Sequence, residues 1–340
     1  MEDIKQSKYN HNYGIALLKM LMCFEVILSH FWVNQSSVLL TPFKLVENKP
    51  VLIFMFLSFY FMERTFLIND HSKIKKRFWR LIYPQIGWTI LYWIILMGIQ
   101  IKVDLGITFS DFLWQLFTGH SIRINPTMWF QTVLIFLTLL FTLTFRYLNK
   151  KGGMAFIILM TILSLWIQYS GLNLKVFGPL RFELRYPLGR ISEMLPYASL
   201  GFFIAYFDIY NRLQKSRALF LILFGLATLL LLKYEYLIPP APGFLYSHNI
   251  LLIFVFFIVG FAYLLPFEQL PDKIKNILQF ISRFTLGIYC MHRLIAFLLL
   301  SKLHIWINSF VLCVIIYILS FCTSYLMCRI SPKYFKQLVE

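Results

Sequence analysis

Long apolar runs separated by short, mostly basic segments dominate the sequence from one end to the other. Ten of these runs are long enough to cross a bilayer, which takes about 20 apolar residues in a helix. They fall at about 14–33, 51–68, 82–101, 127–146, 153–170, 188–208, 218–237, 248–266, 284–302 and 306–328. We therefore predict an all-α polytopic membrane bundle of about ten transmembrane helices. We expect a single domain over residues 1–340, with no fused soluble domain.

The distribution of Lys and Arg predicts how this bundle is oriented. With the N-terminus in the cytoplasm, every second loop faces inward, and these inner loops carry most of the basic residues. Basic loops stay on the cytoplasmic side, so both termini are predicted to be cytoplasmic. Two outer loops are longer, at 102–125 and 171–187, and either shape an entrance or are simple connectors. In the first, the stretch from Asp111 to Phe117 predicts an interfacial helix.

Composition agrees with a membrane protein and argues against nucleic acid and metal ions as ligands. Hydrophobic residues make up 59% of the chain and charged residues 14%, against about 25% charged in soluble proteins. The formal charge of +17 would suggest nucleic acid in a soluble protein. Here the basic residues lie in short inner loops, so we expect anionic membrane lipids as partners and no nucleic acid. The five cysteines show no CxxC and no metal-ligand spacing, and no metal is expected.

Two ionisable residues in the first apolar run are candidates for chemistry. Lys19 and His30 are eleven residues apart, about three helical turns, so both project from nearly the same face of a helix. Charged groups inside a bilayer are costly and often mark functional sites. The pair is expected to face a shared hydrated cavity. The alternatives are an interfacial histidine for His30 and snorkelling toward the inner surface for Lys19.

The inner loop after the second run contains a pair of arginines. Arg77 and Arg80 are three residues apart, which places them on one face if the segment is helical. Paired guanidinium groups at the cytoplasmic surface suit a ligand that carries phosphates. The alternative is ordinary basic sequence of an inner loop.

Further polar candidates lie in or next to later apolar runs. Trp129 follows a proline that starts a helix well, and Arg190 can pair with Glu193 at a spacing of three. Tyr289 and His292 lie within about one helical turn of each other, next to an arginine. A run of this kind is not expected to face lipid. We take these five residues as candidates that line a substrate passage.

Several short segments together resemble the acyltransferase family 3 membrane proteins, which include O-acetyltransferases of bacterial surface polysaccharides. The resemblance spans about residues 10–330, and its order and spacing on the hydropathy profile make it specific. The segments that carry it are Tyr13–Lys19 with Ser29–Phe31, Lys76–Pro84, Met128–Phe130, Pro196–Phe202 and Thr285–His292.

The resemblance also implies roles for the candidate residues. The family places a basic residue eleven positions before a required histidine, which corresponds here to Lys19 and His30. The family usually has Arg at the first position, and Lys keeps the charge but cannot grip a phosphate with two parallel hydrogen bonds. The family's paired arginines match Arg77 and Arg80, which implies that they bind the donor. His30 would act as general base toward the acceptor hydroxyl or pass the acyl group on.

The implied activity is a membrane O-acyltransferase in a bacterial plasma membrane. It would move an acyl group from cytoplasmic acetyl-CoA or another acyl-CoA to a hydroxyl of a surface polysaccharide or its lipid-linked precursor. Acetyl is the preferred group, and succinyl is the alternative. The alternative is a transporter or flippase for a lipid-linked oligosaccharide or exopolysaccharide, which intramembrane charges fit equally well. The sequence shows no two-fold pattern of broken helices that would favour it.

Overall fold

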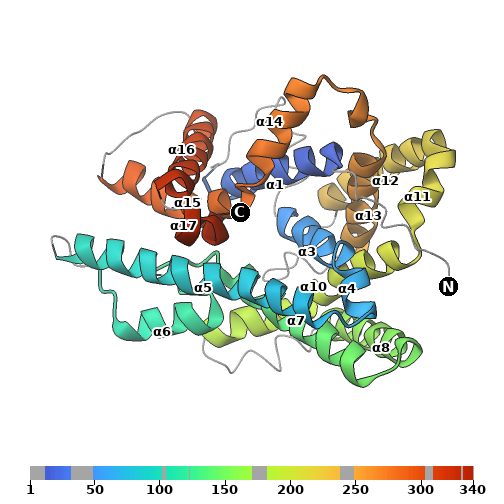
Figure 1. Ribbon diagram of the computed structural model, residues 1–340, viewed down its shortest axis with the longest axis horizontal. Coiled ribbons are helices and arrows are strands. Elements are labelled where there is room, and N and C mark those ends of the chain that lie inside the picture. Colours follow the sequence, from blue (N-terminus) through green and yellow to red (C-terminus); the bar gives the residue numbers. More distant parts are fainter. Residues whose placement is uncertain are drawn as a thin grey trace.

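The computed structural model describes residues 12–31, 49–101, 105–121, 123–170, 182–237, 249–302, 309–330 and 332–339, and within these ranges the elements are helices. The α-helices are α1 (Tyr13–Phe31), α3 (Pro50–Tyr60), α4 (Glu63–Leu67), α5 (His71–Gln100), α6 (Phe109–Thr118), α7 (Trp129–Tyr147), α8 (Lys150–Tyr169), α10 (Phe182–Tyr206), α11 (Ile209–Leu213), α12 (Arg217–Leu237), α13 (Asn249–Leu264), α14 (Asp272–Ser282), α15 (Thr285–Phe297), α16 (Ser309–Ile330) and α17 (Pro332–Val339). Figure 1 shows α1 and α3 in the middle of the molecule, with α15, α16 and α17 on one side and α11, α12 and α13 on the other.

Seven of the described helices are long and apolar enough to cross a membrane, or eight if the bent pair α14 and α15 is one span. The predicted all-helical membrane bundle is therefore confirmed in this coarser form. Three of the ten predicted runs do not qualify alone. The second, α3, has 11 residues, the sixth, α10, carries charges of both signs, and the ninth is bent by 58° against α14. Ten spans and two cytoplasmic termini stay predictions.

The basic segment expected in an inner loop is instead the beginning of α5. Asp70 caps this 30-residue helix, and its carboxylate accepts hydrogen bonds from the Ser72 hydroxyl at 2.7 Å and the Lys73 backbone N–H at 3.1 Å. These bonds lower the pKa of Asp70 to about 2. Pro84 lies inside the helix, which continues to Gln100. The interpretation as a loop was wrong because the N-cap lies before the basic run, not after it.

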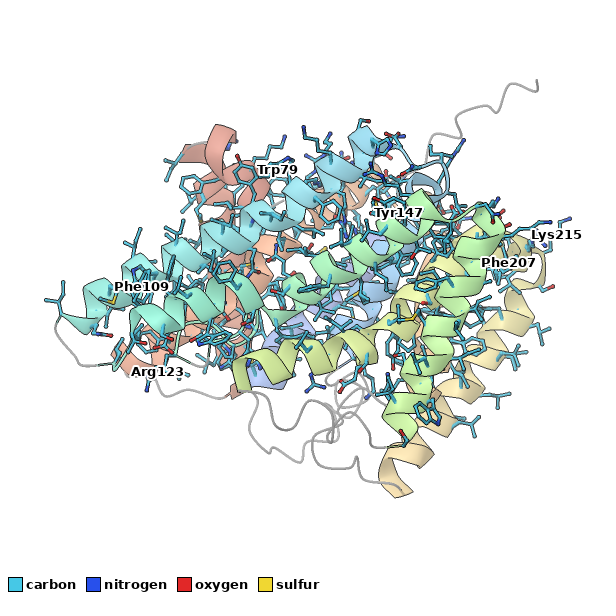
Figure 2. The ribbon with its side chains drawn as sticks, turned by 90° about the horizontal axis from the view of Figure 1, so that it is seen from below. Trp79, Phe109, Arg123, Tyr147, Phe207 and Lys215 are labelled. Atoms are coloured by element: carbon cyan, nitrogen blue, oxygen red, sulfur yellow. The ribbon has the colours of Figure 1, made fainter. Side chains whose placement is uncertain are left out.

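The helix predicted in the 102–125 loop is confirmed as α6. Thr108 and Asp111 form a reciprocal capping box at its start, and Gly119 adopts a left-handed conformation at its end. Figure 2 shows Phe109 and Arg123 at the left of the molecule, Trp79 at the top and Lys215 at the far right.

Two clusters of buried apolar side chains form the core. One is built mainly around α3, α7 and α10, and the other around the second half of α1, the middle of α5, and α15 and α16. Gly201 of α10 lets the first cluster close, because a Cβ there would lie 2.2 Å from the carbonyl oxygen of Phe56 in α3. The candidate site lies where the two clusters meet.

Candidate functional site

A cavity of about 1300 Å³ lies between the two core clusters. Its walls come mainly from α1, α3, α5, α7 and α15, with single residues from α4 and α17. Leu57 and Leu81 of the first cluster and Cys23 and Tyr289 of the second all line it. The cavity therefore uses helices from both halves of the chain, and its shape depends on how these helices pack.

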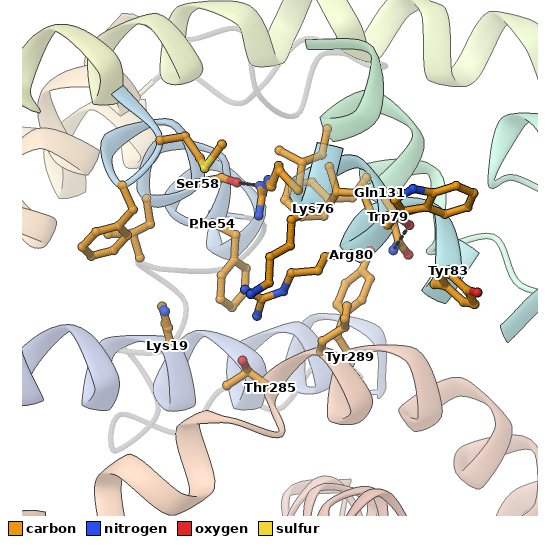
Figure 3. A pocket seen from close by; sticks show the side chains of 18 of the residues that line it. Lys19, Phe54, Ser58, Lys76, Trp79, Arg80, Tyr83, Gln131, Thr285 and Tyr289 are labelled. Atoms are coloured by element: carbon orange, nitrogen blue, oxygen red, sulfur yellow. Dashed lines mark hydrogen bonds between the residues drawn. The ribbon is translucent and has the colours of Figure 1, made fainter. Parts of the chain in front are cut away.

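Among the described residues, the charged side chains that line this cavity are all basic. The basic lining residues are Lys19, Lys73, Lys76, Arg77, Arg80 and Lys336. Figure 3 shows Lys76 and Arg80 reaching from α5 toward the part of the cavity that Lys19 faces from α1. Like charges around a low-dielectric cavity raise its positive potential, and such a site attracts an anionic ligand.

Two side-chain hydrogen bonds fix α5 against its neighbours at the cavity wall. Arg77 donates from Nη2 to the Ser58 hydroxyl of α3. Gln131 of α7 donates from Nε2 to the carbonyl oxygen of Leu81 at 2.7 Å. The basic stretch of α5 is therefore held by helices on two sides, and the Arg77 side chain has a defined position.

The wall contributed by α15 connects the cavity to a pair of histidines. Thr285 and Tyr289 of α15 line the cavity. The Tyr289 hydroxyl donates to the carbonyl oxygen of Thr127, and the Tyr289 ring lies 5.9 Å from that of His292. Tyr289 is thus shared between the cavity and the histidine that follows it by one turn.

His30 and His292 stack on each other, with ring centroids 5.5 Å apart and an interplanar angle of 9°. His292 is fully buried, whereas His30 is exposed. The Nδ1 of His292 faces the carbonyl oxygen of Tyr289, which can only accept, so Nδ1 carries the proton. The Nε2 of neutral His292 therefore holds a lone pair, and it is buried without a hydrogen-bond partner among the described residues.

The three remaining candidates form a separate cluster between α7 and α10. Arg190 and Glu193 make the buried ion pair that their spacing predicted. The Arg190 guanidinium lies 5.7 Å from the centre of the Trp129 ring. None of the three lines the cavity. This cluster ties α7 to α10.

The structure thus brings together some of the predicted residues and separates others. Lys19, Arg77, Arg80 and Tyr289 line one cavity, and His30 lies beside His292 outside that lining. Among the described residues, the lining of this cavity on α1 ends at Cys23, and His30 lies about two turns beyond it. A hydrated cavity shared by Lys19 and His30 stays a prediction.

Sequence reasoning missed several lining residues. Lys73 and Lys76 belong to the same basic run as the paired arginines, and the high density of basic residues in that run was the sequence signal that could have found them. Lys336 lies on the last helix, and only tertiary packing brings it to the cavity. Gln131 shares the first turn of α7 with Trp129, yet Gln131 and not Trp129 lines the cavity. Among the described residues, no group of three or more His, Cys, Asp or Glu could hold a metal ion.

A family model described as an acyltransferase domain matches residues 12–329, nearly the whole chain. The chain belongs to acyltransferase family 3. The resemblance seen in the sequence segments is therefore confirmed. Neither the comparison with curated proteins nor that with solved structures found a match.

Membership of acyltransferase family 3 bears on the two functions that the sequence left open. It supports a multi-pass membrane acyltransferase over a transporter or flippase. Four of the five segments that carried the resemblance contribute directly to the cavity lining, namely those with Lys19, Arg77, Phe130 and Tyr289. The family signal and the basic cavity thus coincide in one part of the molecule.

Proposed function

We propose that this acyltransferase family 3 protein moves an acyl group from cytoplasmic acyl-CoA to a hydroxyl of a bacterial surface polysaccharide or its lipid-linked precursor, with acetyl as the preferred group. The observation that carries the proposal is the cavity, whose charged lining side chains in the described part of the chain are six and all basic. Coenzyme A bears several phosphates, and cations in a partly desolvated cavity bind phosphates through charge-assisted hydrogen bonds.

Arg77, Arg80 and Lys19 would hold the phosphates of the donor. The basic stretch of α5 belongs to a segment predicted to lie on the cytoplasmic side, where acyl-CoA is found. Arg77 is positioned by its bond to Ser58, which orients its remaining N–H groups. The acyl end of the donor would extend along the cavity toward Tyr289.

His30 and His292 are the groups suited to acid–base chemistry at the far side of Tyr289. The acceptor hydroxyl would lose its proton to an imidazole as its oxygen attacks the thioester carbon. The C–O bond forms, the C–S bond breaks, and coenzyme A leaves as a thiolate that takes up a proton. His30 is exposed and can reach an acceptor, while His292 lies beneath it with a fixed tautomer.

Mass analysis of surface glycans from cells with and without the gene tests this proposal. Loss of an acetyl mass on an otherwise intact polymer is the expected result, and loss of exported polymer would instead favour the transporter. A His30→Ala variant, produced at the wild-type level in the membrane, should restore no acetylation. Retained acetylation in that variant would remove His30 from the chemistry.

A further inference from the structure

Two exposed aromatic side chains belong to the cavity and have no assigned role. Trp79 and Tyr83 lie one turn apart on α5, with ring centroids 5.5 Å apart, and 49% and 51% of their surfaces are exposed. Both line the cavity. Large exposed rings beside a basic cavity are available for contact with a planar ligand.

The two rings alternate with cations along one stripe of α5. Lys76, Trp79, Arg80 and Tyr83 follow the spacing i, i+3, i+4 and i+7, which places them on one helix face. All four line the cavity. Figure 3 shows Trp79 and Tyr83 on α5 to one side of the charged ends of Lys76 and Arg80. A ligand that combines phosphates with an aromatic base matches this stripe.

Membrane-interface anchoring is the ordinary role of exposed Trp and Tyr, and other residues of this chain fit it. Trp166 of α8 and Tyr147 of α7 are exposed to 57% and 73%, and neither lines the cavity. Trp79 and Tyr83 differ from them because they share a helix face with cavity cations. Anchoring alone requires no such placement.

We propose that Trp79 and Tyr83 form a stacking platform for the adenine ring of the donor, an inference that rests on the proposed function. The adenine nucleotide then lies at the α5 end of the cavity with its phosphates on Lys76 and Arg80. The pantetheine arm and the thioester extend from there toward Tyr289. Stacking on an aromatic side chain is tolerant of rotation in the plane, which suits an exposed site.

The test compares two donors on the purified protein in lipid vesicles. Acetyl-CoA carries the adenine nucleotide, and S-acetyl-4′-phosphopantetheine has the same reactive thioester without it. Trp79→Leu with Tyr83→Leu is expected to raise the KM for acetyl-CoA roughly tenfold, the loss of one stacked base. The KM for the truncated donor should change less than twofold. Trp79→Phe, which keeps a ring, should retain most of the wild-type preference.

Trp166→Leu is the matched control, because it removes an exposed Trp that lies outside the cavity. It should leave both KM values unchanged. The platform would be overturned if the Trp79 and Tyr83 substitutions changed the KM values for the two donors equally, or changed neither. If the wild-type protein transfers acetyl from neither donor, the proposed function itself fails. If it uses both donors equally well, the function stands and the platform does not.

Discussion

Removing one cation from the cavity gives a direct test of its electrostatic role. Lys76 and Lys75 are neighbours on α5, both exposed, but only Lys76 lines the cavity. Lys76→Gln and Lys75→Gln therefore change the net charge of the protein equally and the charge of the cavity unequally. A comparison of the two separates local binding from the general field of the basic inner surface.

The expected size follows from Coulomb's law. Two unit charges 4 Å apart attract by about 4 kcal/mol at an effective dielectric constant of about 20 and by about 1 kcal/mol in bulk water. Lys76 is exposed at the cavity, so its contact with a donor phosphate belongs near the lower figure, about 1–2 kcal/mol. Lys76→Gln should thus raise the KM for acetyl-CoA roughly five- to thirtyfold. Lys75→Gln should raise it less than twofold, because its charge faces water and is screened.

The assay is acetyl transfer by protein in vesicles at several acetyl-CoA concentrations and two ionic strengths. Screening shortens from about 10 Å at 0.1 M salt to about 3 Å at 1 M. The wild-type KM should therefore rise with salt, and that of Lys76→Gln should rise less. Equal KM values for the two variants would refute the assignment of the cavity to an anionic donor.

Three further predictions concern stability, measured by thermal unfolding in detergent. Gly201→Ala should destabilise by about 1–3 kcal/mol through overpacking against α3, whereas Gly225→Ala, with nothing within 4 Å of the new Cβ, should not destabilise. Arg190→Met alone should lower the free energy of unfolding by about 3–5 kcal/mol, because it leaves the Glu193 charge buried without its partner. Adding Glu193→Leu should recover most of this stability. Equal losses in the single and double variants would contradict a structural ion pair. The pKa of Asp70 is lowered to about 2. The contribution of its carboxylate to folding stability is therefore complete above its ordinary pKa of about 3.9 and is lost as the pH falls toward 2. The difference in stability from Asp70→Asn should therefore be larger at pH 5 than at pH 3.

Arg77 requires a control of its own because it binds a side chain as well as lining the cavity. Arg77 donates to Ser58, so Arg77→Gln removes both a cavity charge and a tie between α5 and α3. Ser58→Ala removes the tie and keeps the charge. If the donor KM responds to Arg77→Gln much more than to Ser58→Ala, the charge is the functional part of the residue.

Hydropathy predicted much of the fold because a bilayer imposes length and apolarity on each span. Three predicted spans do not qualify alone: α3 is short, α10 is charged and α15 is bent against α14. Each contributes to the polar interior: Ser58 to the cavity, Arg190 and Glu193 to an ion pair, and His292 to the histidine pair. Buried polar groups shorten or interrupt the apolar signal, so the hydropathy prediction is weakest where the function is expected.

The candidate site was only partly accessible from the sequence. Helical spacing correctly relates residues on one helix, such as Arg190 and Glu193. It does not show which helices are neighbours, so the contact between His30 and His292, 262 positions later in the chain, could not be predicted. Lys336 is likewise brought to the cavity by α17, where the Trp88 indole donates to the carbonyl oxygen of Leu338 at 2.8 Å. Such contacts depend on tertiary packing that no local pattern records.

The relation between α1 and α15 bears on how one bundle would serve the two substrates of the proposed reaction. The Cys23 thiol donates a hydrogen bond to the carbonyl oxygen of Thr285 at 3.3 Å, and seven residues later on both helices His30 stacks on His292. Equal steps in the same direction mean that the two helices run parallel and in register. Seven residues of helix cover about 10 Å, so the basic cavity and the histidine pair are successive levels of the same two helices. Tyr289 lies between these levels and contacts both. A donor held by its phosphates at the first level would thus present its thioester near Tyr289, within a short distance of a base that an acceptor approaches from the other side.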